Sequence, residues 1–297
     1  MIATFPSFSN LTIETRADIE AFTKTFEPYS DFNFTSLLCW NINDSTAVSN
    51  CNGNLVIRFP DYLSGEPIYT FIGNENVTDT LLTILGTVNR LELVPESAIH
   101  HIDTPELFVI KEDTDQFDYI YSTEDHARLQ GGRFKSKRKL LGRFIRNHGH
   151  RTIAEEINFQ DPKTTERIQH IFDEWAQQKN TSQNEAAQER IALKRLIEHA
   201  HHFDLSGHIV HIDEKSVGFS VTEVLENEFA IYHFQKTLKD YEFLDIHLTR
   251  ISSEHLFRKG AKYINWEQDL GIPGLRHAKT NYKPVRMLKK YSIELRE

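Results

Sequence analysis

The chain has 297 residues, of which 39% are hydrophobic, 11% aromatic and 26% charged; this mixture excludes a disordered chain, and the length favours two domains. It has two cysteines, Cys39 and Cys51, too few for a disulfide framework, and no apolar run reaches the roughly 20 residues that span a bilayer. The net charge of −9 is uneven, because residues 1–118 hold 18 acids and 5 bases whereas the rest hold 25 acids and 29 bases.

The first part of the chain predicts a mixed layer of sheet and helices. Apolar residues at helical spacing behind Thr15 predict one helix, and a second is expected at residues 77–85. Short runs between Asn, Gly and Pro turns predict strands at 35–40, 54–59, 67–72, 91–93, 107–110 and 119–121.

A long polar helix is expected after Gly131 and Gly132. Its apolar positions keep helical spacing, and basic residues occupy its other faces. Composition and charge both change at this point. We therefore predict an N-terminal domain at residues 1–132, a basic connecting helix at 133–150 and a C-terminal domain at 151–297.

The second part of the chain predicts helices and strands in a fixed order. Helices are expected at 162–178 and 184–202, strands at 207–212, 217–225 and 229–235, a helix at 242–258, a strand at 262–266, a short helix after Pro273 and a strand at 285–291. Tight turns are expected at 211–216 and 226–228. This order is typical of an acetyltransferase-like domain.

Two stretches of the second part contain bases and no acids, at residues 133–146 and 276–290. A local basic field inside an acidic protein favours a polyanionic ligand. The alternative is a solvated helix face that acids from elsewhere neutralise.

The strand, loop and helix at residues 229–256 form the first candidate site. Phosphates bind where a strand ends beside a helix N-terminus, and acetyltransferases place a glycine-rich turn there. The turn at 236–241 has no glycine, so we expect Lys236 and Lys239 to supply charge instead. In an extended strand, Tyr232 and Lys236 share one face and His233 lies on the other. The alternative is that Lys236 only caps the strand end.

The end of the strand at 262–266 is the second candidate site, because polar residues are dense before a Gly/Pro turn. They are Asn265, Glu267, Asp269, Arg276, Lys279 and Tyr282. Glu267 or Asp269 can act as a general base, and Tyr282 can protonate a leaving group or cover the core. For Asp269 and Arg276 we favour a loop-holding ion pair over catalysis.

The 15 histidines include a run at 199–202 that suggests a metal site. On a helix only His199 and His202 share a face, and no carboxylate or cysteine completes a set. We therefore predict an exposed helix end and no metal site.

Three segments carry a family resemblance. Residues 263–284, 121–144 and 233–236 resemble the phosphatidylglycerol lysyltransferase C-terminal-like family, and the similarity spans most of residues 30–293. The resemblance implies an α+β fold of two tandem acetyltransferase-like (GNAT) domains, each a mixed, mostly antiparallel sheet flanked by helices. It also implies a basic connecting helix, as in aminoacyl-tRNA-dependent transferases of lipids and peptidoglycan precursors.

The resemblance further implies roles for individual residues. Lys236 lies near the donor, and Asn265, Glu267 and Asp269 line the cleft. The other residues expected to bind substrate here are His233, Lys239, Arg276 and Lys279. The basic helix offers a phosphate-binding surface through Lys135, Lys137 and Arg138.

Three hypotheses of function remain open. The first is an acyl or aminoacyl transferase that uses acyl-CoA or aminoacyl-tRNA as donor, an amine or hydroxyl as acceptor, no other cofactor and no covalent enzyme intermediate. The second is a non-catalytic module of the same fold that binds a nucleotide, RNA or another polyanion. The third is that the acidic first part mediates protein association. No secretory signal is visible at the amino terminus, so we expect a cytoplasmic protein.

Overall fold

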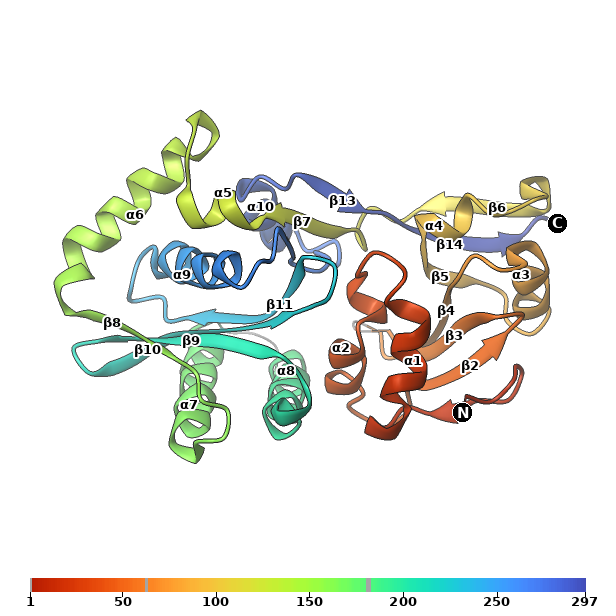
Figure 1. Ribbon diagram of the computed structural model, residues 1–297, viewed down its shortest axis with the longest axis horizontal. Coiled ribbons are helices and arrows are strands. Elements are labelled where there is room, and N and C mark those ends of the chain that lie inside the picture. Colours follow the sequence, from red (N-terminus) through yellow and green to blue (C-terminus); the bar gives the residue numbers. More distant parts are fainter. Residues whose placement is uncertain (1, 62–63, 180–182) are drawn as a thin grey trace. The chain divides into compact units, whose positions relative to one another are not determined.

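The computed structural model describes residues 2–61, 64–179 and 183–297, which fold into two compact units (Figure 1). The first unit holds the chain up to Tyr119 together with Glu267–Lys279 and Met287–Glu297, and the second holds Ile120–Trp266 and Thr280–Arg286. The division predicted from sequence at residues 132 and 150 stays a prediction. Among the described residues, no helix is both long and apolar enough to cross a membrane.

The first unit contains two antiparallel sheets. One has four strands in the order β1 (Ser9–Asn10), β2 (Ala47–Cys51), β3 (Asn54–Pro60) and β4 (Pro67–Ile72). The other has three strands in the order β5 (Leu91–Pro95), β14 (Lys290–Leu295) and β6 (Phe108–Glu112). The strand β14 therefore pairs on both sides with strands from the first half of the chain.

The helices of the first unit are short. They are α1 (Arg16–Thr23), α2 (Phe34–Cys39), α3 (Val77–Leu85), α4 (Glu96–Ile99) and most of α10 (Pro273–Asn281). Buried residues of α3 such as Leu81 and Ile84 pack with Phe71 of β4, Val94 of β5 and Ile293 of β14 in one hydrophobic cluster. Burying each such side chain contributes about 1.5–3 kcal/mol, so α3 ties the two sheets together.

The strand predicted at residues 35–40 is wrong, because these residues form the helix α2. The side chain of Asn33 accepts a hydrogen bond from the amide of Ser36 at 2.8 Å and caps the helix. All six residues of α2 are buried. In a short segment that is buried on all sides, polar residues do not recur with a helical or a strand periodicity. The sequence of such a segment therefore does not distinguish a helix from a strand.

The second unit is built around a sheet of seven strands. Its order is β13 (Arg286–Leu288), β7 (Asp118–Ser122), β12 (Tyr263–Asn265), β11 (Phe229–Thr237), β10 (Lys215–Val224), β9 (Leu205–Ile212) and β8 (Thr152–Glu156). The hairpin predicted between β9 and β10 is confirmed; Asp213 and Glu214 take the left-handed backbone conformation that its tight turn requires, with φ of 49° and 65°.

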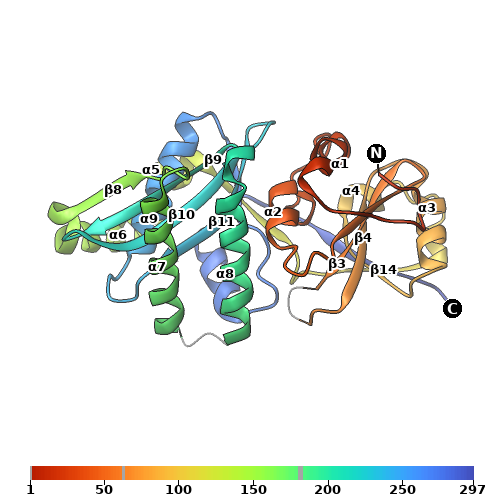
Figure 2. The same ribbon diagram turned by 90° about the horizontal axis from the view of Figure 1, so that it is seen from below.

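Helices cover both faces of this sheet. The helices α7 (Pro162–Lys179) and α8 (Gln183–Glu198) lie side by side on one face (Figures 1 and 2). The helix α9 (Leu244–Arg258) lies on the other face, and α5 (Thr123–Arg128) and α6 (Lys135–His148) pack against it. The two helices, the three-stranded meander and the helix predicted for residues 162–258 are therefore confirmed.

The strand β11, which packs against α9, has two irregularities. The parallel pairing of β11 with β12 covers only Phe229–Ile231 and Tyr263–Asn265, although β11 continues to Thr237. The pairing of β11 with β10 shifts register, because Val221 lies opposite Phe234 whereas Thr222 lies opposite Tyr232. One residue, His233, is thus inserted as a β-bulge, a feature that re-aims the side chains after it.

Candidate active site

The helix α9 begins just after the end of β11, where parallel strands commonly present ligands. Phe243 before it takes a left-handed conformation, with φ of 67°, which turns the chain into the helix. Asp245 lies in the first turn. The positive end of the helix dipole stabilises a negative group at this position, whether the carboxylate of Asp245 or a ligand phosphate.

Tyr282 reaches this helix end. Its hydroxyl donates a hydrogen bond to Oδ2 of Asp245 at 3.1 Å, and the ring is buried. Burial, aided by the charge of Asp245, raises the pKa of Tyr282 well above its ordinary value. Tyr282 therefore keeps its proton at neutral pH and can act as a donor.

Lys137 of α6 covers the same tyrosine. Its Nζ lies 3.3 Å from the centroid of the Tyr282 ring, within the range of a cation–π interaction. Burial lowers the pKa of Lys137 to about 8, although the charge of Asp245 opposes the shift. The fold thus brings together two residues that the sequence analysis singled out separately.

A cluster of rings surrounds the tyrosine. The rings of Tyr121, His126 and Trp266 lie with neighbouring centroids 4.6–5.3 Å apart, and Tyr282 lies 4.7 Å from Trp266. Nε2 of His126 lies 2.9 Å from the carbonyl oxygen of Tyr282, and burial lowers the pKa of His126 to about 4. The imidazole is therefore neutral and donates this hydrogen bond through Nε2.

A buried polar network continues from Asp245 below α9. Gln235 donates to the carbonyl oxygen of Asp245 at 3.2 Å and accepts from Thr249 and Tyr232 at 3.0 and 2.7 Å. The hydroxyl of Tyr232 also lies 3.2 Å from Oγ of Ser252. These bonds fix the first turns of α9 on the sheet, and they hold Asp245 in place.

Lys236 faces the other side of the sheet. Its Nζ bonds Glu189 of α8 at 2.5 Å and lies 3.9 Å from the ring centroid of Trp175 of α7. The expectation that Tyr232 and Lys236 share a face is therefore wrong, because the bulge at His233 reverses the alternation. Lys239 also joins α7, where its Nζ and amide donate to Gln178.

The remaining predicted binding residues of the second unit have mixed surroundings. Nε2 of His233 lies 3.2 Å from Glu223, and Asn265 is fully buried in β12. Arg138 donates to the carbonyl oxygens of Leu129 and Gly131, so it holds the turn before α6, while Lys135 is exposed. Their proposed contacts with a substrate stay predictions.

Four predicted site residues belong to the first unit: Glu267, Asp269, Arg276 and Lys279. Asp269 has a fully buried side chain; it accepts two hydrogen bonds from Arg276 at 2.8 Å and one from Tyr119 at 2.6 Å. Burial by itself raises the pKa of Asp269, because it disfavours the charged carboxylate. The hydrogen bonds to the carboxylate lower the pKa by more, so the pKa lies below its ordinary value. Asp269 and Arg276 thus form the predicted ion pair, and the catalytic role predicted for Asp269 stays a prediction.

Lys279 also holds this loop. Its Nζ donates to the carbonyl oxygens of Glu267 and Gln268 at 3.1 and 2.6 Å. Burial lowers the pKa of Lys279 to about 8. The backbone of Glu267 is left-handed, with φ of 58°, and its carbonyl oxygen accepts a second hydrogen bond from the amide of Tyr119 at 3.2 Å.

We expect Asp269→Asn to lower the free energy of unfolding by about 2–3 kcal/mol, because two charge-assisted bonds lose their charge. The ionised Asp269 has a depressed pKa, so its contribution is present at neutral pH and is lost as the pH falls through the folded-state value, below 3.8. Urea unfolding measures both effects. Asp115→Asn is the control, because Asp115 bonds the same Arg276 at 2.5 Å from an exposed position; equal losses in the two variants would contradict the prediction.

The first unit also buries a group of charges that the sequence analysis missed. Nζ of Lys290 contacts Asp31 and, at 2.7 Å, Asp118, and all three side chains are 0% exposed. Ser30 donates to Asp118 through its amide and hydroxyl at 2.7 and 2.8 Å, and Gln268 donates to Asp31 at 3.3 Å. Burial opposes the charge of Lys290, but Asp118 and Asp31 outweigh it and raise its pKa.

The chain is similar to one known protein family and to several solved structures. The family model described as phosphatidylglycerol lysyltransferase, C-terminal, matches residues 24–294. A conserved protein of unknown function from Bacteroides thetaiotaomicron has a TM-score of 0.84 at 28% identity, with 100% of each chain covered. No curated protein matches the chain.

Two further solved structures have the same fold. L-PGS from Bacillus licheniformis has a TM-score of 0.62 at 12% identity, covering 100% of this chain and 94% of that one. The C-terminal domain of a putative lysylphosphatidylglycerol synthetase from Agrobacterium fabrum has a TM-score of 0.63 at 13% identity, covering 94% and 92%. The predicted α+β fold of acetyltransferase-like type, rich in antiparallel sheet, is thus confirmed.

Proposed function

We propose that this chain, which belongs to the phosphatidylglycerol lysyltransferase C-terminal family, moves an acyl or aminoacyl group onto an amine or hydroxyl acceptor. The observation that carries the proposal is the hydrogen bond from Tyr282 to Asp245 at the start of α9, with Lys137 above the tyrosine ring. A proton donor, a carboxylate and a cation thus lie together where β11 ends.

In the proposed reaction the acceptor attacks the acyl carbonyl and passes its proton to Asp245. The bond from the carbonyl carbon to the leaving oxygen or sulfur breaks, and that atom takes the proton of Tyr282. Asp245 then returns the acceptor's proton to Tyr282 along the 3.1 Å hydrogen bond. Protons balance, and both residues return to their starting state without a covalent enzyme intermediate.

For the donor we propose aminoacyl-tRNA over acyl-CoA. The turn from Lys236 to Tyr241 has no glycine to let the backbone approach a pyrophosphate closely. The basic helix α6, with exposed Lys135 and Lys139 beside Lys137, suits the spaced phosphates of a polynucleotide. Because the matching family is described as phosphatidylglycerol lysyltransferase and one structural relative is named a putative lysylphosphatidylglycerol synthetase, a phospholipid with a free hydroxyl is the acceptor that we propose first.

The test is transfer of radiolabelled lysine from lysyl-tRNA to phosphatidylglycerol vesicles, with acetyl-CoA and small amines as parallel donor and acceptors. Label in the lipid supports the full proposal, whereas label in amines keeps the transferase and changes the acceptor. The turn without glycine also favours a binding module, which would bind tRNA with no transfer from any donor. That last result would overturn the transferase proposal.

We expect tRNA binding to weaken as the pH rises through about 8. The pKa of Lys137 is about 8, so its cation prevails below that pH, and a bound phosphate favours the charged form. Filter binding at constant ionic strength between pH 6.5 and 9.5 measures the effect. Lys137→Met removes the pH dependence, whereas Lys139→Met at an exposed position of α6 weakens binding and leaves the midpoint unchanged. An unchanged midpoint in Lys137→Met would refute this assignment.

A further inference from the structure

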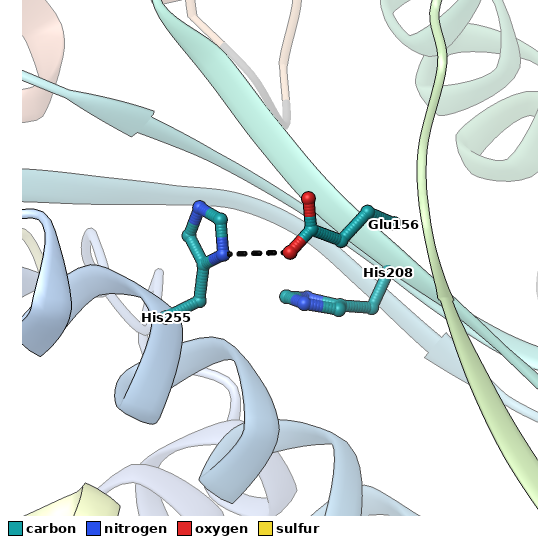
Figure 3. A group of neighbouring side chains, drawn as sticks. All are labelled: Glu156, His208 and His255. Carbon is teal, nitrogen blue, oxygen red and sulfur yellow. Dashed lines mark ion pairs between the residues drawn. The ribbon is translucent and has the colours of Figure 1, made fainter.

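Three side chains of the second unit converge at the edge of its sheet (Figure 3). Glu156 of the edge strand β8 lies directly opposite His208 of β9 in the antiparallel register. His255 reaches the pair from the last turn of α9. The three residues come from three elements and are held by sheet pairing and helix packing.

The separations suit one small cation. Each residue offers one ligand atom, and the three atoms lie within 4.8 Å of one another. Nδ1 of His255 lies 3.4 Å from Oε1 of Glu156. Bonds of about 2.0–2.2 Å to a tetrahedral Zn²⁺ put neighbouring ligand atoms about 3.3 Å apart. The distance between Nδ1 of His255 and Oε1 of Glu156 therefore already fits such an ion.

Nδ1 of His208 is buried and has no hydrogen-bond partner in the described part of the chain. On His255 the nitrogen that faces Glu156 is Nδ1, so this nitrogen is the one that would bind the ion. The residue His208 is 4% exposed. A neutral imidazole with an unused lone pair is the form that binds metal ions.

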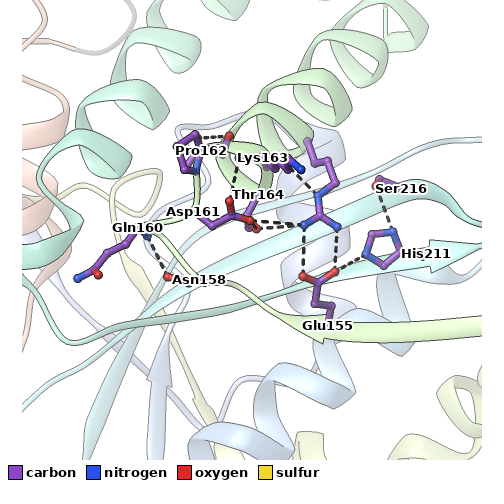
Figure 4. A network of polar contacts seen from close by, with 11 residues as sticks. Glu155, Asn158, Gln160, Asp161, Pro162, Lys163, Thr164, His211 and Ser216 are labelled. Atoms are coloured by element: carbon purple, nitrogen blue, oxygen red, sulfur yellow. Dashed lines mark hydrogen bonds and ion pairs between the residues drawn. The ribbon is translucent and has the colours of Figure 1, made fainter.

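The opposite face of the same strands provides a contrast (Figure 4). There Glu155 bonds Arg167 through both oxygens, at 2.9 and 3.3 Å, and lies 3.0 Å from Nε2 of His211. Nδ1 of His211 lies 3.1 Å from Oγ of Ser216. Every polar atom of that histidine and carboxylate has a protein partner, which makes a structural network and leaves no ligand position.

We propose that Glu156, His208 and His255 bind one divalent transition-metal ion. Two imidazole nitrogens and one carboxylate oxygen are a donor set for Zn²⁺ and its neighbours, whereas Mg²⁺ and Ca²⁺ require mainly oxygen ligands. The side chain of Glu156 is 70% exposed, which gives the ion a path from solvent.

The bound ion would fasten the last turn of α9 to β8. His255 lies about 15 Å along the helix from Asp245, at about 1.5 Å per residue. The ion is therefore a structural clamp on the helix that carries Asp245, and it takes no part in the proposed transfer. This inference stands whether or not the chain is a transferase.

Calorimetric titration of the full chain with ZnCl₂, after chelator treatment and dialysis, tests the proposal. We expect one ion per chain, and at least a tenfold loss of affinity in His255→Ala and in Glu156→Gln. The double variant His201→Ala/His202→Ala is the control, because these exposed histidines in the turn after α8 can bind zinc adventitiously. Circular dichroism checks that each variant is folded, and the exposed Glu156 makes Glu156→Gln a safe second variant.

A second measurement separates specific from surface binding. Co²⁺ bound by the three residues gives visible absorption bands of a four- or five-coordinate site, which both ligand variants lose and the control variant keeps. Zn²⁺ raises the melting temperature of the wild type and not of His255→Ala. The proposal is overturned if the wild type binds no ion in a one-to-one ratio, or if the control variant loses the binding and the ligand variants retain it.

Discussion

Lys290→Met is expected to lower the free energy of unfolding by about 3–5 kcal/mol. The variant leaves Asp31 and Asp118 as two carboxylates without their cation, and both are 0% exposed. Burial already raises the pKa of Asp31 against the opposing charge of Lys290. Removing the lysine therefore forces a carboxylate to take up a proton or to draw in water, and either change loosens the first unit. Urea unfolding followed by tryptophan fluorescence and circular dichroism measures the loss.

The matched control is the neighbouring residue. Lys289→Met removes an exposed lysine that pairs with Glu96 and Glu112, and its free energy of unfolding stays close to the wild-type value. Adding Asp31→Asn and Asp118→Asn to Lys290→Met removes the buried negative charges, so this triple variant recovers part of the stability. Equal effects at positions 289 and 290 would show that the buried charges do not stabilise the first unit.

Tyr282→Phe is expected to lower the rate of group transfer by a factor of about 10²–10⁴, the usual contribution of a positioned proton donor. The variant keeps the ring beneath Lys137 and loses the hydroxyl that bonds Asp245. Binding of tRNA therefore stays near the wild-type level while the maximal rate falls. Single-turnover transfer from lysyl-tRNA separates the two quantities.

Tyr263→Phe is the control for this variant, because Tyr263 packs on Phe229 in the same sheet, with ring centroids 5.1 Å apart. Its transfer rate stays unchanged, and thermal unfolding verifies that both variants are folded. A leaving group that needs no proton, such as an activated thioester, partly rescues Tyr282→Phe. A full rate in Tyr282→Phe with lysyl-tRNA would exclude Tyr282 as the proton donor.

Periodic patterns in the sequence predicted much of the second unit. The alternating and helical spacings of residues 162–258 predicted α7, α8, the meander and α9, since each pattern is local. The strand predicted at residues 35–40 was wrong, because the α2 segment is buried on all sides and its sequence therefore has no polar face that indicates a helix. The inserted His233 reversed the faces of β11, and no local signal distinguishes a bulge from a regular strand.

The candidate site was only partly predictable for the same reason. Tyr282 and Lys137 were singled out one by one, but their contact with each other and with Asp245 depends on how α6 and α9 pack. Asp245 was missed, although an acid in the first turn of a predicted helix was a usable signal. Likewise, ligand spacing along one helix carries no signal for the metal site that we propose, because Glu156, His208 and His255 come from three separate elements.

The position of β14 has a consequence for synthesis on the ribosome. This strand fills the centre of a three-stranded sheet whose outer strands, β5 and β6, emerge long before it. The whole of Ile120–Trp266 is translated in between. Until β14 is synthesised, the nascent first unit has two strands with open edges and acids that lack Lys290, so its completion waits until the second unit has been translated.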